Sequence, residues 1–444
     1  MSSSPSRTTL SVPDLRQEFK GAVISPDDPG YDQARQEFYG GFEDLRPAMI
    51  IRPVDVAEVA QVIRLARDSG LELAVRGGGH STAGHSTSDG GLVLDLSAMK
   101  QLEIDPAGRS LWAEAGLTAG EVTTTVGEHG LAVGFGDTGS VGIGGLTLGG
   151  GVGFLVRKHG LTIDNLLGVE LVTADGDVLQ VDDQQHPELF WALRGGGGNF
   201  GVATRFHYRL HPLDQVVGGM LLLPADARVI AGFMAAAEAA PEELSGIANI
   251  MVAPPMPMIP AEAHGQLVMV ALMVYAGPAD QAEGVLAPFR ALATPLADLL
   301  QPMPYHAMFQ AEEEEFHPTA VSHTMFVDRV DLPVAETIME HLEASDAPIR
   351  VAQLRALGGA VARVPADATA YPHRQRPVMV NLAAFYEGPA DRAVRQAWVD
   401  GFAAALDQGD SSAYVNFLGD EGAARVREAY PGSTWDRLVA VKRR

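Results

Sequence analysis

Apolar and polar positions alternate in an ordered way from residue 47 onward. A short apolar run over 47–53, bounded by prolines, predicts a strand. Apolar residues then recur at every third or fourth position from 56 to 66. This spacing predicts a helix that Asp55 caps and Gly70 ends. A second apolar run over 72–75 completes a strand–helix–strand unit.

Similar patterns continue to residue 211. Residues 1–30 lack such a pattern and are expected to form a loose arm. Between them and residue 211 we expect further strands over 92–96, 102–104, 111–115 and 202–210, helices over 118–128 and 186–193, and a hairpin over 169–181 with the turn Asp175-Gly176.

Beyond residue 211, apolar strands alternate with alanine-rich helices. The acidic stretch 312–315 is interpreted as a solvated loop. The arrangement indicates an α+β fold, with an antiparallel sheet covered by helices. We expect its strands over 246–252, 266–275 and 378–385, and its helices over 228–239, 280–293, 335–344 and 391–405.

Three consecutive glycines, Gly77 to Gly79, separate the strand expected at 72–75 from His80. Glycine has no Cβ, so this backbone can turn sharply and approach a flat or anionic ligand. Arg76 adds a positive charge, and free NH groups in such a loop can point at a phosphate. The loop therefore indicates a nucleotide cofactor.

Two further runs are rich in glycine. Residues 134–153 hold ten glycines in twenty positions, and a close-fitting ligand explains this density better than packing alone. Residues 196–201 match the GxGxxG pattern of dinucleotide-binding folds. That fingerprint needs a strand before it and a helix after it, and the order expected here is the reverse, which argues against a Rossmann site. His80 and His85 do not have the spacing of zinc ligands.

Composition and charge narrow the class of protein further. At 444 residues, two domains are the reasonable expectation. The net charge of −24 is unfavourable for binding nucleic acid or an anionic membrane surface. We find neither an apolar stretch of the ~18 residues that span a bilayer nor an apolar signal core near residue 1, so a cytoplasmic location is expected. The absence of cysteine excludes disulfides, thiolate metal sites and cysteinyl cofactor links.

Five motifs occur together in a specific order. They resemble the berberine bridge enzyme-like FAD-linked oxidases of the vanillyl-alcohol oxidase superfamily. The resemblance is strong over residues 30–212, moderate over 414–442 and weak between them. The motifs are Arg-Gly-Gly-Gly-His-Ser at 76–81, the glycine run at 144–153, Arg-Lys-His-Gly-Leu-Thr-Ile-Asp-Asn-Leu at 157–166, Arg-Gly-Gly-Gly-Gly-Asn-Phe-Gly at 194–201 and Tyr-Val-Asn-Phe at 414–417.

The resemblance implies an FAD-binding domain of the vanillyl-alcohol oxidase type in two parts, residues 1–211 and 406–444. Residues 212–405 would form the substrate-binding domain, with its sheet over the flavin. His80 matches the histidine that carries the flavin covalently. Many relatives add a cysteinyl link, and Thr138 stands at that position, so attachment through His80 alone is expected. The alternative is an ordinary hydrogen-bonding histidine.

The resemblance also implies which residues contact FAD, nearly all of them in or beside the five motifs. They are Arg76, Gly77, Gly78, Gly79, His80, Ser81, Gly84, His85, Thr138, Gly139, Ser140, Val141, Gly144, Gly145, Leu148, Gly149, Gly150, Gly151, Gly153, Asp164, Asn165, Val172, Gly198, Asn199, Gly201, Val202 and Asn416.

Tyr414 matches a tyrosine that faces flavin and substrate, and it is the candidate catalytic base. Its ordinary pKa near ~10 is too high for that role, so a partner or a nearby cation is expected. The partner should come from the strand at 378–385, where Asn381 is the only polar side chain. An extended segment would place Tyr414 and Asn416 on one face. A core tyrosine is the alternative. Further pocket candidates, each with a structural role as alternative, are Tyr275, Tyr305, His306 and His323.

The function implied by the resemblance is that of an FAD-dependent oxidase. It would take a hydride from an alcohol or amine carbon of a small organic molecule and pass the electrons to O2, giving H2O2. Val141 matches the residue that guards oxygen access. The alternatives are a dehydrogenase with another acceptor, a flavin-dependent cyclase of secondary metabolism, and a flavin-binding protein without turnover. The substrate and the oligomeric state stay open.

Overall fold

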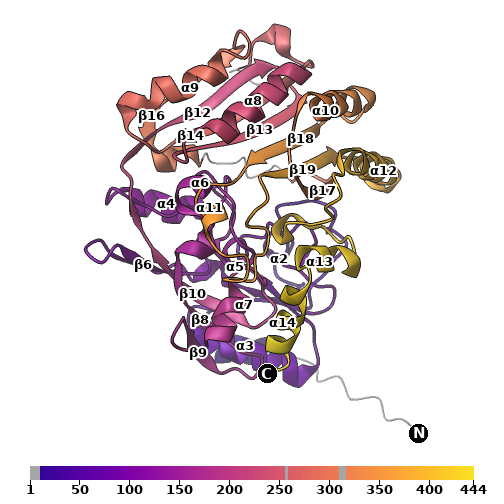
Figure 1. Ribbon diagram of the computed structural model, residues 1–444. Coiled ribbons are helices and arrows are strands. Elements are labelled where there is room, and N and C mark those ends of the chain that lie inside the picture. Colours follow the sequence, from indigo (N-terminus) through magenta and orange to yellow (C-terminus); the bar gives the residue numbers. More distant parts are fainter. Residues whose placement is uncertain (1–10, 256–258, 310–316) are drawn as a thin grey trace.

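The computed structural model describes residues 11–255, 259–309 and 317–444. Figure 1 shows two bodies, one above the other. The lower body holds a four-stranded and a five-stranded sheet, residues 131–132 and 211–212 pair in a separate two-stranded sheet, and the upper body is a single large sheet beneath a layer of helices. The expected α+β class is confirmed. The acidic stretch at 312–315 lies outside the described residues.

The first sheet of the lower body contains the predicted strand–helix–strand unit. Strands β2, β4 and β3 run parallel, and β1 pairs antiparallel with β2. Asp55 caps the helix by accepting from the Glu58 NH, and Gly70 ends it with a φ of 67°. The elements are β1 (Ala22–Ile24), β2 (Met49–Arg52), α3 (Val56–Ser69), β3 (Leu73–Arg76) and β4 (Leu92–Asp95).

The second sheet of the lower body has five antiparallel strands in the order β5-β6-β10-β8-β9. Thr118 and Glu121 form a capping box at the start of α4, where the sequence predicts a helix. The elements are β5 (Leu102–Asp105), β6 (Ser110–Glu114), α4 (Ala119–Gly127), β8 (Leu166–Val172), β9 (Val178–Val181), α7 (Pro187–Leu193) and β10 (Val202–Arg209).

The expectation of a loose arm over residues 1–30 is wrong for its described part. Helix α1 (Val12–Glu18) and β1 pack against the lower body, and α2 (Tyr31–Ala34) follows them. Leu15, Phe19 and Val23 are buried in its core. These elements are too short to show a hydrophobic periodicity in the sequence. Their structure depends on packing against the lower body and on the pairing of β1 with β2 rather than on a local sequence signal.

The upper body is an eight-stranded sheet with the strand order β15-β12-β14-β13-β18-β19-β17, and β16 pairs with β12. Helices α8, α9, α10 and α12 lie above it (Figure 1). The expected helices are confirmed, whereas β12, β15, β16, β17 and β18 were not expected. The elements are β12 (Gln215–Pro224), α8 (Ala227–Ala239), β13 (Leu244–Val252), β14 (Leu267–Tyr275), α9 (Ala282–Arg290), β15 (Ala297–Asp298), β16 (Gln301–Pro304), β17 (Ala320–Val327), α10 (Leu332–Ala344), β18 (Arg350–Ala356), β19 (Val378–Phe385) and α12 (Gly388–Leu406).

After α12 the chain returns to the lower body, where its last helices pack beside α7 (Figure 1). Trp191 of α7 and Leu438 of α14 share one apolar cluster. Shorter elements complete the fold: β7 (Leu131–Ala132), α5 (Ile143–Gly149), α6 (Val156–His159), β11 (His211–Pro212), α11 (Ala360–Arg363), α13 (Ala423–Ala429) and α14 (Ser433–Lys442).

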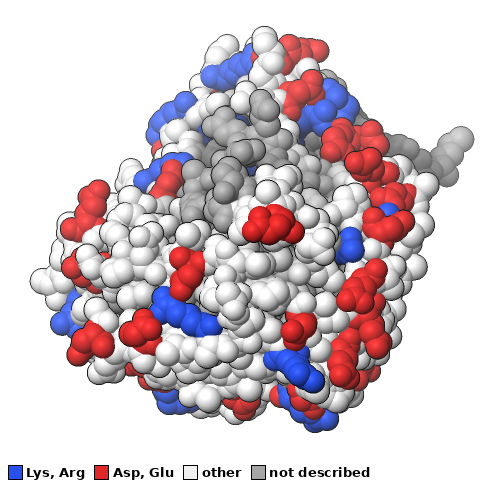
Figure 2. Space-filling model, turned by 90° about the horizontal axis from the view of Figure 1, so that it is seen from above, with Lys and Arg blue, Asp and Glu red and all other residues white. Residues whose placement is uncertain are grey.

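The described helices include none that is both long enough and apolar enough to cross a bilayer. On the face that Figure 2 shows, basic side chains lie scattered among acidic ones rather than in a continuous basic tract.

Candidate active site

Helix α5 lies inside the second glycine run and connects it to the third. The backbone NH groups of Gly195 and Gly197 both donate to the carbonyl of Leu148, at 2.9 and 3.0 Å. The run at 134–153 therefore contains a helix rather than turns alone. Helix α7 precedes Gly195, and β10 follows the loop, so the order of elements is opposite to that of a dinucleotide fingerprint.

The same helix is joined to the C-terminal segment through Asn416. The Asn416 side-chain amide donates to the carbonyl of Leu146 at 3.0 Å. A Cβ added to Gly149 would overlap this amide. Segments that lie far apart in the sequence thus meet at α5.

The loop that carries His80 packs against the start of the second glycine run. A Cβ on either Gly78 or Gly142 would overlap the backbone of the other. His80 Nε2 lies 2.9 Å from Ser140 Oγ, and the ring of Phe38 stacks on the imidazole at 4.0 Å. Burial lowers the pKa of His80 to about 4, so the ring is neutral at physiological pH.

Arg76 points away from the loop surface and into the lower body. Its guanidinium pairs with Glu37 at 2.5 Å and donates to backbone carbonyls, including that of Ala34. Only 6% of the residue is exposed. The Arg76 charge is therefore balanced by Glu37.

Asp164 and Asn165 are occupied by contacts within the protein. Arg374, which is fully buried, donates to both Asp164 oxygens at 2.7 and 2.8 Å. Asn165 donates to the carbonyls of His159 and Leu161 and lies 2.6 Å from His211 Nε2. These two side chains hold the loop after α6, and their polar atoms are used there rather than toward a cofactor.

Packing explains several motif glycines that the sequence assigns to a ligand. An added Cβ would overlap Thr162 at Gly151, the Phe135 carbonyl at Gly153 and the Val172 carbonyl at Gly201. A close-fitting ligand is therefore not needed for this part of the glycine density, and that expectation is corrected. Gly145 and Gly198 differ, because nothing lies within 4 Å of an added Cβ at either position.

The other predicted cofactor residues lie around these loops. The Asn199 amide donates to the Gly196 carbonyl at 2.8 Å, and Val172 pairs with Val202 where β8 and β10 meet. The His85 NH donates to Ser81 Oγ at 3.1 Å. Thr138 Oγ1 lies 3.5 Å from Asp137 Oδ1.

Tyr414 reaches the glycine run with its hydroxyl group. The hydroxyl oxygen accepts from the Gly151 NH and from the Asn416 amide, both at 2.9 Å. The expected extended segment is wrong, since residues 415–417 form a single 3₁₀ turn closed by the Phe417 NH and the Tyr414 carbonyl. Tyr414 and Asn416 nevertheless meet, because the turn folds one side chain back toward the other.

Opposing influences act on the acidity of Tyr414. Burial raises its pKa, and the donors Gly151 and Asn416 together with the nearby Arg355 guanidinium lower it, with burial as the largest cause. The net direction is upward, so the hydroxyl is protonated at neutral pH. Arg355 on β18 is thus a cation near Tyr414, of the kind expected from the sequence. It was not among the residues predicted there.

Alternation along β19 decides which side chains face the lower body. Val380 and Leu382 pack in the core beneath the helices, whereas Met379 shares an apolar cluster with Tyr414. Asn381 therefore lies on the same face as Met379. Directly opposite Asn381 on β18 is Gln353. Gln353 is therefore a second polar side chain beside Asn381 on this face, and the alternation of the polar residues Gln353 and Arg355 with apolar ones could have revealed it.

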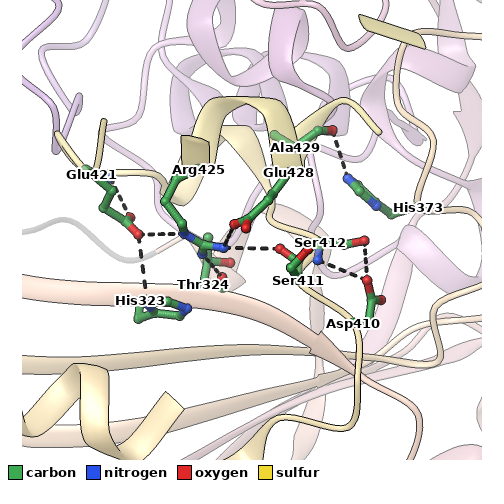
Figure 3. Close-up of polar contacts among 11 residues, drawn as sticks. His323, Thr324, His373, Asp410, Ser411, Ser412, Glu421, Arg425, Glu428 and Ala429 are labelled. Carbon is green, nitrogen blue, oxygen red and sulfur yellow. Dashed lines mark hydrogen bonds and ion pairs between the residues drawn. The ribbon is translucent and has the colours of Figure 1, made fainter. Parts of the chain in front are cut away.

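The C-terminal segment that carries Tyr414 is held against β17 by Arg425 (Figure 3). Arg425 donates to the carbonyls of Thr324 at 2.7 Å and Ser411 at 3.1 Å, and it pairs with Glu421 and Glu428. Because an arginine only donates, these acceptors fix its position. The contacts fix the segment on both sides of the 3₁₀ turn.

The further pocket candidates have structural positions. Tyr275 lies in the core beneath the helices, on the opposite face of the sheet from Asn381. Tyr305 packs with Phe309 in a separate cluster, and His306 lies against Gly127 of α4. His323 lies 3.9 Å from Glu421, and burial lowers its pKa. The structural alternative is favoured for all four.

Comparison of the sequence with known proteins agrees with this geometry. Residues 47–182 match the FAD binding domain family. Over 216 residues the chain is 43% identical to (R)-6-hydroxynicotine oxidase of Paenarthrobacter nicotinovorans, an alignment covering 48% of this chain and 47% of the relative. It spans about half the length of that relative. The uncharacterized FAD-linked oxidoreductase YgaK of Bacillus subtilis (strain 168) is 28% identical, over 96% of this chain and 94% of that protein.

Solved structures with the same fold cover nearly the whole chain. The crystal structure of 6-hydroxy-D-nicotine oxidase from Arthrobacter nicotinovorans superposes with a TM-score of 0.84 at 29% identity, covering 96% of this chain and 95% of that one. BBE-like 1 of Physcomitrella patens gives a TM-score of 0.85 at 22% identity, covering 98% and 96%, which concerns the fold alone. The chain therefore contains an FAD binding domain, has the fold of 6-hydroxy-D-nicotine oxidase and of BBE-like proteins, and is similar in sequence to FAD-linked oxidoreductases, whose shared motifs meet at α5.

Proposed function

We propose that this protein is an FAD-dependent oxidase that removes a hydride from an alcohol or amine carbon of a small organic molecule and transfers the electrons to O2, giving H2O2. The observation that carries the proposal is the position of Tyr414. Its hydroxyl accepts from the Gly151 NH in the glycine run, and Tyr414 shares an apolar cluster with Met379, on the face of the sheet that presents Asn381. The relative named (R)-6-hydroxynicotine oxidase supports an oxidase.

The residues of the lower body fit FAD as the cofactor. Open space beside Gly145 and Gly198 leaves room for a ligand at two motif positions, and the buried, neutral His80 lies beside the second glycine run. When bound, FAD accepts the hydride and passes electrons onward. His80 would hold it covalently, because a neutral imidazole has a lone pair available for bonding. The link is expected through His80 alone, since Thr138 has no thiol.

Tyr414 would receive the proton that leaves the substrate oxygen or nitrogen. Gly151 and Asn416 donate to its oxygen, and Arg355 lies nearby, so a phenolate there would be stabilised. Asn381 would orient the substrate from the sheet. Because burial raises the pKa of Tyr414, the phenolate is a minor form at neutral pH and its fraction grows as the pH is raised.

A peroxide assay with a panel of alcohols and amines tests the oxidase directly. Turnover should produce H2O2 in air, and bound flavin should bleach and stay bleached without oxygen. Substrate-dependent bleaching in air without peroxide would instead indicate a dehydrogenase with another acceptor. A spectrum that no compound changes would contradict the oxidase.

Oxygen access is proposed to depend on Val141, which lies between Ser140 and Gly142 beside the His80 loop. Val141→Ile adds a methylene there and should slow reoxidation of reduced enzyme by air. Stopped-flow mixing of the reduced protein with O2 measures this rate. Equal rates for variant and parent would remove Val141 from the proposal. A cytoplasmic location is part of the proposal, and cell fractionation tests it.

A further inference from the structure

Three amides occupy one register across the sheet, on the face turned toward Tyr414. Asn249 of β13 lies opposite Gln353 of β18, and Gln353 lies opposite Asn381 of β19. The same register continues to Thr324 of β17. Directly opposed residues of antiparallel strands have neighbouring side chains. We call Asn249, Gln353 and Asn381 the amide row.

One end of the amide row is fixed by Arg355. The Arg355 Nε donates to Gln353 Oε1 at 2.9 Å, and the Gln353 amide donates to Asn249 Oδ1 at 2.9 Å. Because arginine only donates, the oxygen of Gln353 must face Arg355, and this sets the orientation of both amides. The Asn249 amide in turn donates to the Val270 carbonyl at 3.3 Å. At this end of the amide row, the side chains of Gln353 and Asn249 therefore already have hydrogen-bond partners within the protein.

The other end of the amide row has unused polar atoms. Asn381 Oδ1 and Thr324 Oγ1 are buried and have no hydrogen-bond partner within the described part of the chain. Buried polar groups in folded proteins nearly always have a partner. A substrate group that forms a hydrogen bond would supply it here.

The face that carries the amide row offers no free charge. In strands β13, β14, β17, β18 and β19, all of them fully described, the side chains on this face include one charged group, Arg355. Arg355 pairs with Asp137 at 2.7 Å, and only 4% of Arg355 is exposed. A charged substrate group would lose its hydration here without gaining a counter-ion, which is costly.

We propose that the amide row selects an uncharged substrate group, either a hydroxyl, an amide or the unprotonated form of an amine, which Asn381 and Thr324 bind. This inference rests on the proposed function and names the substrate class of that site. Arg355 acts as a positioning residue, since it orients Gln353 and Asn249 and does not itself bind the substrate group.

The test measures binding, so it does not require turnover. Flavin-loaded protein is titrated with two matched sets of probes: benzyl alcohol, benzoate and benzylammonium, and N-acetylglucosamine, glucuronate and glucosammonium. The readouts are the flavin difference spectrum and the thermal midpoint. In each set that binds, the neutral member should bind tightest, by roughly tenfold or more.

Asn381→Asp should shift selection toward the cationic probes by roughly tenfold or more relative to the neutral ones, because the new carboxylate supplies a counter-ion. Asn381→Leu should weaken the neutral probes and leave the thermal midpoint of the ligand-free protein unchanged. Gln281→Glu adds a carboxylate at the exposed start of α9 and is the matched control. It should keep the parent selectivity.

The inference is overturned if a charged probe binds the parent as tightly as its neutral counterpart, if Asn381→Asp and Gln281→Glu give the same selectivity, or if no neutral probe binds. Selective binding without peroxide from any compound would reject the oxidase and leave the amide row supported. The two failures are therefore distinguishable.

Discussion

At the scale of residues, burial changes the chemistry of His80 and Tyr414 in opposite senses. It lowers the pKa of His80 to about 4, which keeps the imidazole neutral at physiological pH. It raises the pKa of Tyr414, which keeps the phenol protonated there. The first effect suits covalent attachment of a cofactor. The second means that proton acceptance by Tyr414 depends on Gly151, Asn416 and Arg355.

His80→Ala should abolish covalent attachment of flavin, because alanine offers no nucleophile. The measurement is flavin fluorescence of the denatured protein on a gel. His85→Ala, on the same loop but exposed, is the control and should keep the fluorescence. If acid precipitation releases all flavin from the parent protein, the covalent link through His80 is wrong.

The resemblance of the motifs predicted roles for His80, Tyr414 and Asn416, and a lone polar side chain in an apolar strand predicted one for Asn381. Gln353 and Arg355 were missed because no strand was expected over 350–356. Their positions depend on the pairing of β18 with β19, which no local pattern encodes. The roles of Asp164 and Arg76 were also not readable, since their partners Arg374 and Glu37 lie far away in the sequence.

At the scale of elements, α5 and the 3₁₀ turn at 415–417 form one interlocked unit. The helical signal of α5 is weak, because the helix has only seven residues and three of them are glycine. The helix is stabilised by tertiary contacts from Gly195, Gly197 and Asn416. Apolar spacing predicted α3 and alanine-rich composition predicted α8 and α12, and each of these helices buries an apolar stripe.

Gly149→Ala should destabilise this unit, because the added Cβ overlaps the Asn416 amide and one of the two must move. We expect a loss of about 1–3 kcal/mol in the free energy of unfolding, together with weaker flavin retention. Gly284→Ala in α9, where nothing lies within 4 Å of an added Cβ, is the control and should be neutral or stabilising. Equal free energies of unfolding for the two variants would contradict a stabilising contact between α5 and the turn at 415–417.

At the scale of the whole molecule, buried arginines join the two bodies. Arg157 donates to the carbonyls of Ala237 and Leu244 in the upper body, at 2.8 and 3.0 Å. Arg374 follows β18 in the chain and pairs with Asp164 in the lower body. The α+β class followed from the pattern of apolar strands and alanine-rich helices, whereas these connections did not, because charged residues are usually expected at the surface.

Arg374→Met should cost about 3–5 kcal/mol of unfolding free energy, since Asp164 would be left buried without its partner. Arg376→Met removes the ion pairs of Arg376 with Asp328 and Asp410; because the arginine side chain is 35% exposed, the change should cost no more than about 1 kcal/mol. Denaturant unfolding of both proteins measures the difference. A similar small cost for both would show that the pair of Arg374 and Asp164 is not required for stability.

The central claim, that Tyr414 accepts the substrate proton at a flavin site, is tested most directly by anaerobic flavin reduction in Tyr414→Phe. The change removes one hydroxyl and keeps the ring, so flavin loading should survive. We expect reduction to slow by about 10²–10⁴. In the parent protein the reduction rate should rise with pH, because the raised pKa of Tyr414 makes the phenolate more abundant at higher pH. That rise should disappear in the variant. Reduction at the parent rate with the same pH dependence would contradict the claim.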